Sequence, residues 1–172
     1  MPITAPDTAP KPKQERWQRR MYLDTRIDPS TGTPELYLIG EDNDDLTRAI
    51  SWNTNTVKNV VGHTSTSSTK SEETVSADPF YAREGDAMAA LLQHFDETNA
   101  ELDSIKRNYY EAKIDNTGAT IYAFRQIADI KLQSVGGPAD DADSLPFEIS
   151  LSGAKIEQNY SFATEKFTDV TP

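Results

Sequence analysis

The sequence predicts a mainly β domain, a sandwich or barrel with one flanking α-helix. Many short segments alternate apolar and polar residues, which is the period of a half-buried strand. Turn residues separate these segments, and only one segment has the period of a helix. At 172 residues the chain has the length of one domain. We assign that domain to residues 21–172 and an extended arm to residues 1–20.

The arm is basic and rich in proline, with Pro2, Pro6, Pro10 and Pro12 opposing regular hydrogen bonding. Residues 1–20 hold five basic and two acidic side chains, a charge of +3. The whole chain carries −11, which leaves −14 for the remaining residues. Such an arm either docks on the acidic body of another copy or stays solvated. Its candidate contact residues are Arg16, Trp17, Arg19 and Arg20, although Trp17 has the alternative of packing on its own domain.

Two short strands are expected ahead of a long polar segment. Residues 33–40 form the first, and residues 46–52 form the second, which ends at Trp52, an expected core anchor. Residues 54–76 are mostly Thr, Ser, Asn, Lys and Glu, an unusually long excursion for a compact domain. They predict either a flexible loop or an exposed β-hairpin that gains partners on assembly. The candidate inter-subunit contacts here are Val57, Asn59, Val60, Val61, His63, Thr64, Thr66 and Lys70.

The predicted helix follows Gly85. Asp86 is a suitable N-cap, because its carboxylate can accept from the free N–H groups of the first turn. Four apolar residues then recur at helical spacing, which predicts a stripe packed on a sheet. They are Met88, Leu91, Leu92 and Phe95.

The C-terminal half predicts further strands. Alternation over residues 109–115 indicates a strand with one wet face. Residues 122–132 have apolar side chains on both faces, which indicates burial by the core on one side and partly by a neighbour on the other. Residues 147–151 and 156–162 predict two strands joined as a hairpin about Gly153.

Composition and motifs exclude several functional classes. The absence of cysteine from the sequence excludes disulfides, thiolate metal sites and cysteine nucleophiles. His63 and His94 are isolated in the sequence, and no hydrolase, metalloprotease or phosphate-loop motif is present, so we expect no enzyme, metal or cofactor. The acidic runs at 41–45 and 140–143 lack the glycine and glutamate of a calcium loop.

Charge and hydropathy limit the partners and the location. A net charge of −11 argues against ordinary nucleic-acid binding, which needs basic side chains to displace phosphate counterions. No apolar run has the length of a membrane span, and no secretory leader is present, so synthesis in the cytoplasm is expected. A hydrophobic fraction of 36% and a mean hydropathy of −0.65 are low for a compact monomer. Disordered segments, or surface that is buried on assembly, account for this composition.

Several short motifs follow one another in a specific order between Ile50 and about Phe95. They are Ile50-Ser-Trp-Asn, Lys58-Asn-Val-Val-Gly, the long polar segment, Asp78-Pro-Phe-Tyr-Ala and the helix. A looser likeness extends to Leu145-Pro-Phe-Glu-Ile and Thr164-Glu-Lys-Phe-Thr. This order resembles the major tail tube protein of long-tailed, non-contractile bacteriophages and related prophages.

The resemblance implies a tail-tube fold and a structural subunit of the phage tail in the virion, made in the host bacterial cytoplasm. Such subunits form hexameric rings that stack into a hollow conduit for viral DNA, and their long loop often reaches a neighbouring subunit or ring. The implied partners are further copies of the chain, a tape-measure protein, a tail terminator and a distal tail protein, with no membrane. Double-stranded DNA would pass without sticking if carboxylates lined the lumen. The candidates are Glu111, Asp115, Asp129, Glu148 and Glu157.

Two alternatives stay open. A ligand- or carbohydrate-binding β-sandwich module would need an aromatic platform, for which Phe80, Tyr81, Tyr109 and Tyr110 are the candidates. An inner tube subunit of a contractile tail or injection machine would share the expected fold, and no sequence feature separates it from a non-contractile tube subunit.

Overall fold

The computed structural model describes residues 13–41, 46–137 and 142–170. Most of the predicted arm, residues 1–12, lies outside the described residues. So do Asp42 to Asp45 of the first acidic run and Asp140 and Asp141 of the second.

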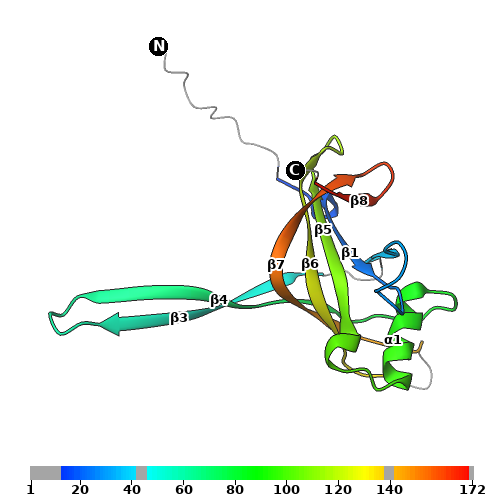
Figure 1. Ribbon diagram of the computed structural model, residues 1–172, viewed down its shortest axis with the longest axis horizontal. Coiled ribbons are helices and arrows are strands. Elements are labelled where there is room, and N and C mark those ends of the chain that lie inside the picture. The colour runs from blue at the N-terminus through cyan, green and yellow to red at the C-terminus, as the bar shows by residue number, and fades with distance from the viewer. Residues whose placement is uncertain (1–12, 42–45, 138–141, 171–172) are drawn as a thin grey trace, which may run out of the picture.

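The described residues form eight strands, one α-helix and two short 3₁₀ turns, drawn in Figure 1. The helical elements are η1 (Arg16–Gln18), α1 (Ala87–Glu97) and η2 (Leu102–Ile105). The strands are β1 (Arg19–Asp24), β2 (Leu36–Leu38), β3 (Arg48–Lys58), β4 (Thr64–Ala77), β5 (Lys106–Ile114), β6 (Thr120–Leu132), β7 (Phe147–Ser161) and β8 (Lys166–Asp169).

The strands form a single antiparallel sheet in the order β2-β1-β5-β6-β7-β4-β3, and β8 pairs with the C-terminal end of β7. Sequence neighbours pair directly in most cases, as hairpins do, and β1 pairs with β5 across a long connection. The predicted mainly β fold with one flanking helix is confirmed.

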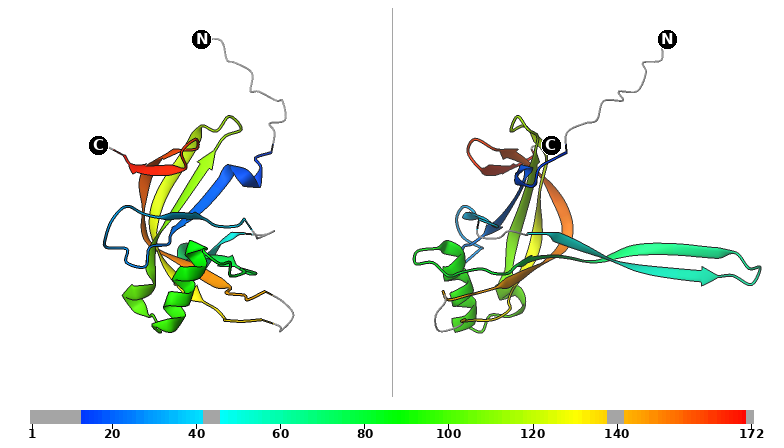
Figure 2. Two further views of the ribbon diagram at one scale, coloured as in Figure 1. Left: turned by 90° about the vertical axis from the view of Figure 1, so that its right-hand side faces the viewer. Right: turned by 180° about the vertical axis from the view of Figure 1, so that it is seen from behind.

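The main core lies between α1 and one face of the sheet. Asp86 caps the helix as predicted, since its Oδ1 accepts from the N–H groups of Met88 at 2.7 Å and Ala89 at 3.0 Å. The predicted apolar stripe of α1 is buried against Tyr109, Ile130 and other apolar side chains of the sheet. Figure 2 shows α1 beside the sheet, on the side opposite to the projecting β3–β4 hairpin.

A second, smaller cluster covers the other face at the C-terminal end of the sheet. Tyr22, Tyr110 and Tyr160 pack around Phe167 of β8, and the hydroxyls of Tyr22 and Tyr160 lie 2.8 Å apart. The sheet is therefore covered by α1 on one face towards one end and by β8 on the other face towards the opposite end, as Figure 1 shows.

The predicted hairpin about Gly153 is wrong, because β7 runs through this position as one strand from Phe147 to Ser161. Ser152 pairs with Ile127 and Ile156 pairs with Arg125, so three residues of β7, 153–155, lie opposite a single residue of β6, Gln126. Gly153, which in the sequence favours a turn, therefore lies in a β-bulge, where its φ is +72°. The bulge bends β7 across the sheet, as Figure 1 shows.

The folded chain also begins earlier than residue 21. Arg19 and Arg20 lie in β1 and pair with Lys113 and Ala112 of β5, because the basic run continues directly into an apolar strand. In the described part of the chain, residues 13–15 of the predicted arm come before the first regular element, η1.

Candidate assembly surfaces

The β3–β4 hairpin projects from the body as a two-stranded ribbon. Its strands pair from Arg48 opposite Val75 to Lys58 opposite Thr64. Only residues 73–77 of β4 pair with β7, so the outer part of the ribbon is hydrogen-bonded to itself alone. Figure 1 shows this part extending far from the rest of the molecule. A two-stranded ribbon has little stability of its own in water.

The outer ribbon carries small polar side chains along most of its length. Hydroxyl pairs join Thr54 to Ser68 at 3.2 Å and Thr56 to Thr66 at 3.3 Å across the strands. Segment 54–76 is therefore a regular ribbon whose side chains are mostly exposed. All the predicted contact residues of this segment lie in the outer ribbon or its turn, with Lys70 at the inner end next to the root.

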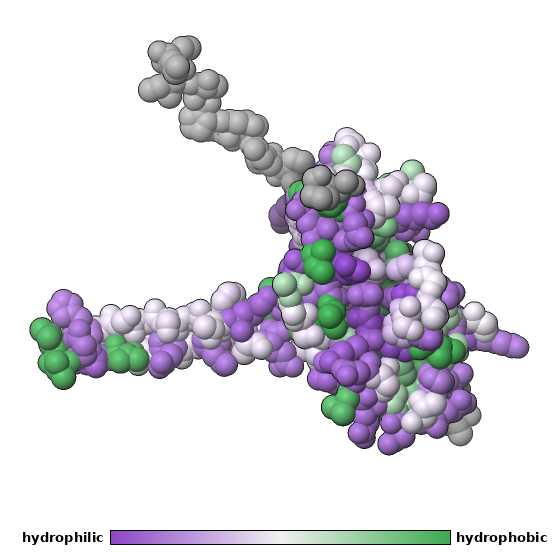
Figure 3. All heavy atoms as spheres, viewed as in Figure 1, coloured by the Kyte–Doolittle hydropathy of each residue, from purple (hydrophilic) through white to green (hydrophobic). Residues whose placement is uncertain are grey.

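The tip of the ribbon is a tight turn that presents two valines to solvent. The Asn59 side chain accepts from the N–H groups of Val61 at 3.1 Å and His63 at 2.9 Å, and its backbone N–H donates to the carbonyl of His63. Val60 and Val61 are 105% and 76% exposed. Figure 3 shows the resulting apolar end on a largely polar ribbon. The turn is thus fixed locally, while its apolar side chains have no cover in this chain.

An ion cluster holds the root of the ribbon. The buried Glu73 carboxylate lies 3.0 Å from Lys70, 3.7 Å from Lys155 and 3.8 Å from Arg48. Burial disfavours the charged carboxylate, but the three cations outweigh it and hold the pKa of Glu73 below its ordinary value. Lys155 and Arg48 also stack over the Phe124 ring at 4.3 and 5.6 Å. The predicted contact residue Lys70 therefore stabilises the root.

Glu111 extends this cluster into the protein and does not fit the prediction that it faces a lumen. Its side chain is 0% exposed and accepts from Arg19 at 2.7 Å, Tyr109 at 2.8 Å and Tyr122 at 3.0 Å, with Arg48 at 3.5 Å. Burial, together with the Glu111 charge, raises the pKa of Tyr109 well above its ordinary value. The face of β5 predicted to be wet is covered here by the ribbon root and β1.

The other acidic candidates do not form one row. Asp129 and Glu148 share the sheet face away from α1, where Asp129 pairs in register with Ser150 and Lys131 pairs with Glu148. The Lys131 ammonium lies 3.6 Å from Glu148 and donates to Ser150 at 2.8 Å. Asp129 and Glu148 therefore belong to neighbouring cross-strand pairs on that face, and the sheet brings the two acids together.

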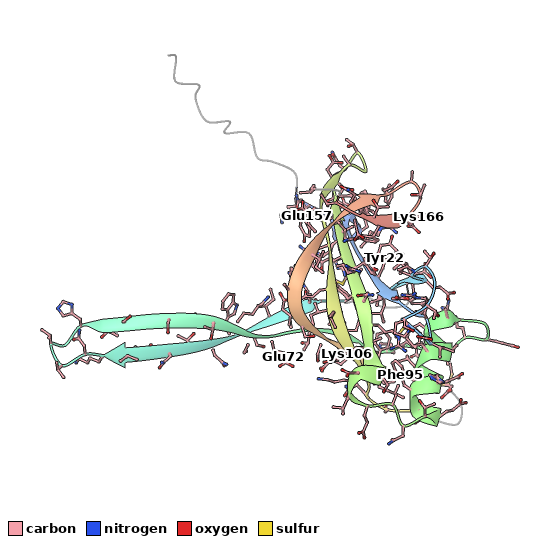
Figure 4. All side chains as sticks on the ribbon, viewed as in Figure 1. Tyr22, Glu72, Phe95, Lys106, Glu157 and Lys166 are labelled. Atoms are coloured by element: carbon pink, nitrogen blue, oxygen red, sulfur yellow. The ribbon has the colours of Figure 1, made fainter. Side chains whose placement is uncertain are left out.

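Asp115 and Glu157 lie elsewhere. Asp115 accepts from Thr117 and from the N–H of Ala119, which orders the β5–β6 turn and lowers the pKa of the carboxyl. Glu157, labelled in Figure 4, is exposed and lies opposite Phe124, on the face that carries the main core. Only Asp129 and Glu148 of the five candidates therefore share a surface.

The described arm residues contact their own domain. Arg16 donates to the carbonyl of Leu46 at 2.8 Å, Arg19 binds Glu111, and Arg20 lies 3.2 Å from Glu165 and over the Phe162 ring. The indole N–H of Trp17 donates to Glu15 at 2.7 Å, and its side chain is 45% exposed. Among these four, Trp17 presents the most apolar surface to a second molecule.

Two exposed apolar residues are contact candidates that the sequence does not predict. Trp52 is not a core anchor: it is 61% exposed on the ribbon opposite Lys70, beyond a register shift at Ser51. Leu102 is 81% exposed and has a φ of +52°, a left-handed conformation that is costly for a branched side chain. The sequence gives no signal for Leu102, whereas a tryptophan beside a long polar segment is compatible with either location.

The aromatic platform that a carbohydrate-binding module would need is not formed by its predicted residues. Tyr109 and Phe80 are buried in the main core, and Tyr110 is buried in the second cluster. No helix among the described residues has the length and apolar character that crossing a membrane requires.

Comparison with solved structures finds similar folds, two of which are described below. No protein-family model matches the sequence, and no curated protein matches it significantly. The cap that terminates the tube of the anti-feeding prophage superposes with a TM-score of 0.52 at 12% identity, covering 88% of this chain and 93% of that chain. The sheath/tube terminator of the PVC extracellular contractile injection system, in its extended state, gives 0.51 at 13% identity, covering 88% and 100%. At this identity the likeness shows a shared fold.

Proposed function

We propose that this chain is a structural subunit of a phage-tail-like tube. Copies would join into rings, and the rings would stack into a hollow conduit for viral DNA. The observation that carries this proposal is the β3–β4 ribbon, whose outer part leaves its own body and ends in exposed valines. Such an element gains buried contacts only from another molecule. The fold shared with a tube cap and a tube terminator supports the same role.

The role needs binding between copies rather than turnover, so we assign the chain no catalytic residue and no cofactor. The sheet order leaves β2 and β3 as its two outer strands, which are available to strands of adjacent copies. The hexameric ring, a location in the virion and the tape-measure, tail-terminator and distal tail partners follow from the resemblance to tail tube proteins. The surplus of negative charge would keep DNA from adhering to the wall.

A second candidate is a cap or terminator that closes the end of a tube in a contractile particle. The observation that favours it is the nature of the two similar structures, which are a tube-terminating cap and a sheath/tube terminator. A tube subunit adds copies along the axis without limit, whereas a terminator stops after one ring. The two candidates therefore differ in the length of what they build.

Negative-stain electron microscopy of the full chain at several concentrations tests the proposal. We expect hollow, striated tubes for a tube subunit and isolated rings for a terminator. The variant V60S/V61S makes both exposed apolar positions polar, so it should fold normally but assemble only at higher concentration. A monomer at every concentration, even with the tape-measure protein and its chaperones, would reject both candidates.

A further inference from the structure

The valine tip of the ribbon has the properties of a preformed docking element. Asn59 fixes the turn through its two side-chain hydrogen bonds, so Val60 and Val61 lose little freedom when they bind. Lys58, two residues ahead of the valines, gives the tip a positive charge. The tip lies far from its own body, on the side opposite to α1, so its receptor belongs to another molecule.

A hollow of about 480 Å³ lies where α1 ends and η2 begins. Its apolar lining is Phe95 of α1, Ala100, Leu102 and Ile105 of η2, and Ile130 and Leu132 of β6. By volume the hollow is wide enough for two valine side chains. A shallow apolar depression of this kind on a surface is a common site of protein contact.

The border of this hollow carries two acidic side chains, and its basic side chain, Lys131, is already paired with Glu148. Asp96 and Glu101 line it, and neither forms an ion pair with any described residue. Asn99 and Leu102 have left-handed backbone conformations, with φ of +49° and +52°. This conformation is common for an asparagine that follows a helix, whereas it costs free energy for a leucine, and such residues gather at functional sites.

We propose that the hollow between α1, η2 and β6 receives the Val60–Val61 tip from a second copy of this chain. The valines meet the apolar part of the lining, and Lys58 meets Asp96 and Glu101, so both the hydrophobic and the charge patterns are complementary. The valine tip and the hollow lie on different parts of the surface, so the contact is heterologous and propagates from copy to copy. This inference rests on the proposed assembly and names the surface that the ribbon binds.

Cross-linking of paired cysteines tests the contact directly, because the natural chain has no cysteine. The variant V60C/L102C is assembled and treated with a short bis-maleimide, and the products are separated under denaturing conditions. We expect a ladder of covalent oligomers, which V60C alone and L102C alone do not give. The matched control V60C/N116C places the second cysteine in the β5–β6 turn, at the other end of β5, and should give no ladder.

The outcomes separate this inference from the proposed function. Tubes or rings that form without a V60C/L102C ladder, or that give a ladder with N116C instead, overturn the contact and leave the assembly role intact. A chain that never assembles removes both.

Reversing the charges at Lys58 and Glu101 tests the contact a second time without cysteine. K58E and E101K should each raise the concentration needed for assembly about tenfold, the effect expected for losing one close ion pair. The double variant K58E/E101K should return close to the natural value. Failure of the double variant to recover, with each single variant folded, would contradict the proposed pairing.

Discussion

Glu111 shows how one buried carboxylate can join parts of the chain that are distant in sequence. It accepts from Arg19 of β1 and from Tyr109 and Tyr122 of the central strands, and it lies close to Arg48 at the ribbon root. Removing a charge from water is costly, and this carboxylate is stabilised because both oxygens have hydrogen-bond donors. Glu111 thereby ties the ribbon root to the start of the folded chain.

The substitution E111Q tests this contribution. The amide keeps the size of the side chain but leaves Arg19 and Arg48 without their buried counter-charge, so we expect unfolding free energy to fall by about 2 to 4 kcal/mol. Urea unfolding followed by tryptophan fluorescence measures the change. E157Q, the same substitution at an exposed position, should stay within about 0.5 kcal/mol of the natural protein. Equal effects in the two variants would contradict the role of Glu111.

Glu73 predicts a pH dependence of stability. Its folded-state pKa lies below that of an unfolded glutamate, about 4.3. The contribution of Glu73 is therefore complete above the unfolded pKa and is lost as pH falls through the folded value. We expect E73Q to reduce the drop in urea midpoint between pH 5.5 and 3. E72Q, which removes the neighbouring exposed carboxylate, is the control. A drop as steep in E73Q as in the natural chain would exclude this contribution.

At the scale of elements, the N-cap of α1 contributes to holding the helix over the main core. Asp86 accepts from two N–H groups of the first turn and from the Tyr37 hydroxyl at 3.1 Å. D86A should cost about 1 kcal/mol of unfolding free energy, because these donors lose their acceptor. D86N keeps an acceptor oxygen and should recover most of the loss. Urea unfolding followed by circular dichroism measures both, and an unchanged D86A midpoint would show that the cap is dispensable.

Elements that depend on local pattern are predictable from this sequence, and those that depend on packing are not. The helix follows from Asp86 and the apolar spacing behind it, both of which act within a few residues. The Gly153 signal is ambiguous, because a left-handed glycine serves a turn and a bulge equally well, and pairing with β6 decides between them. The burial of Glu111 depends on β1 and the ribbon root, which are remote in sequence.

The candidate contact surfaces divide in the same way. Composition marks residues 54–76 as lying outside the core, since a long Thr- and Ser-rich segment with a few valines cannot form one, but it leaves open whether they form a loop or a ribbon. Alternation cannot tell which acidic residues share a face, because that requires the register of several strands. Asp129 and Glu148 lie together for this reason, whereas Glu157 projects from the opposite face after the β7 bulge.

For the whole molecule, the proposed assembly predicts a change in hydrogen exchange. In the monomer, amides of residues 52–58 and 64–70 should exchange quickly, because the outer ribbon has no packing beneath it. Assembly should slow these amides by at least about tenfold, while the central strands β5 and β6 stay protected in both states. Mass spectrometry of the two forms measures the difference. Equal exchange of the ribbon before and after assembly would mean that the ribbon remains free.

Strand β4 passes without interruption from the ribbon tip into the sheet, where its last residues pair with β7. A force on the tip is therefore carried past the Glu73 ion cluster to the short stretch of β4 that pairs with β7. A small sideways displacement of the tip would load the hydrogen bonds between β4 and β7. Strain imposed on one subunit by its neighbour would reach the sheet of the body along a single strand.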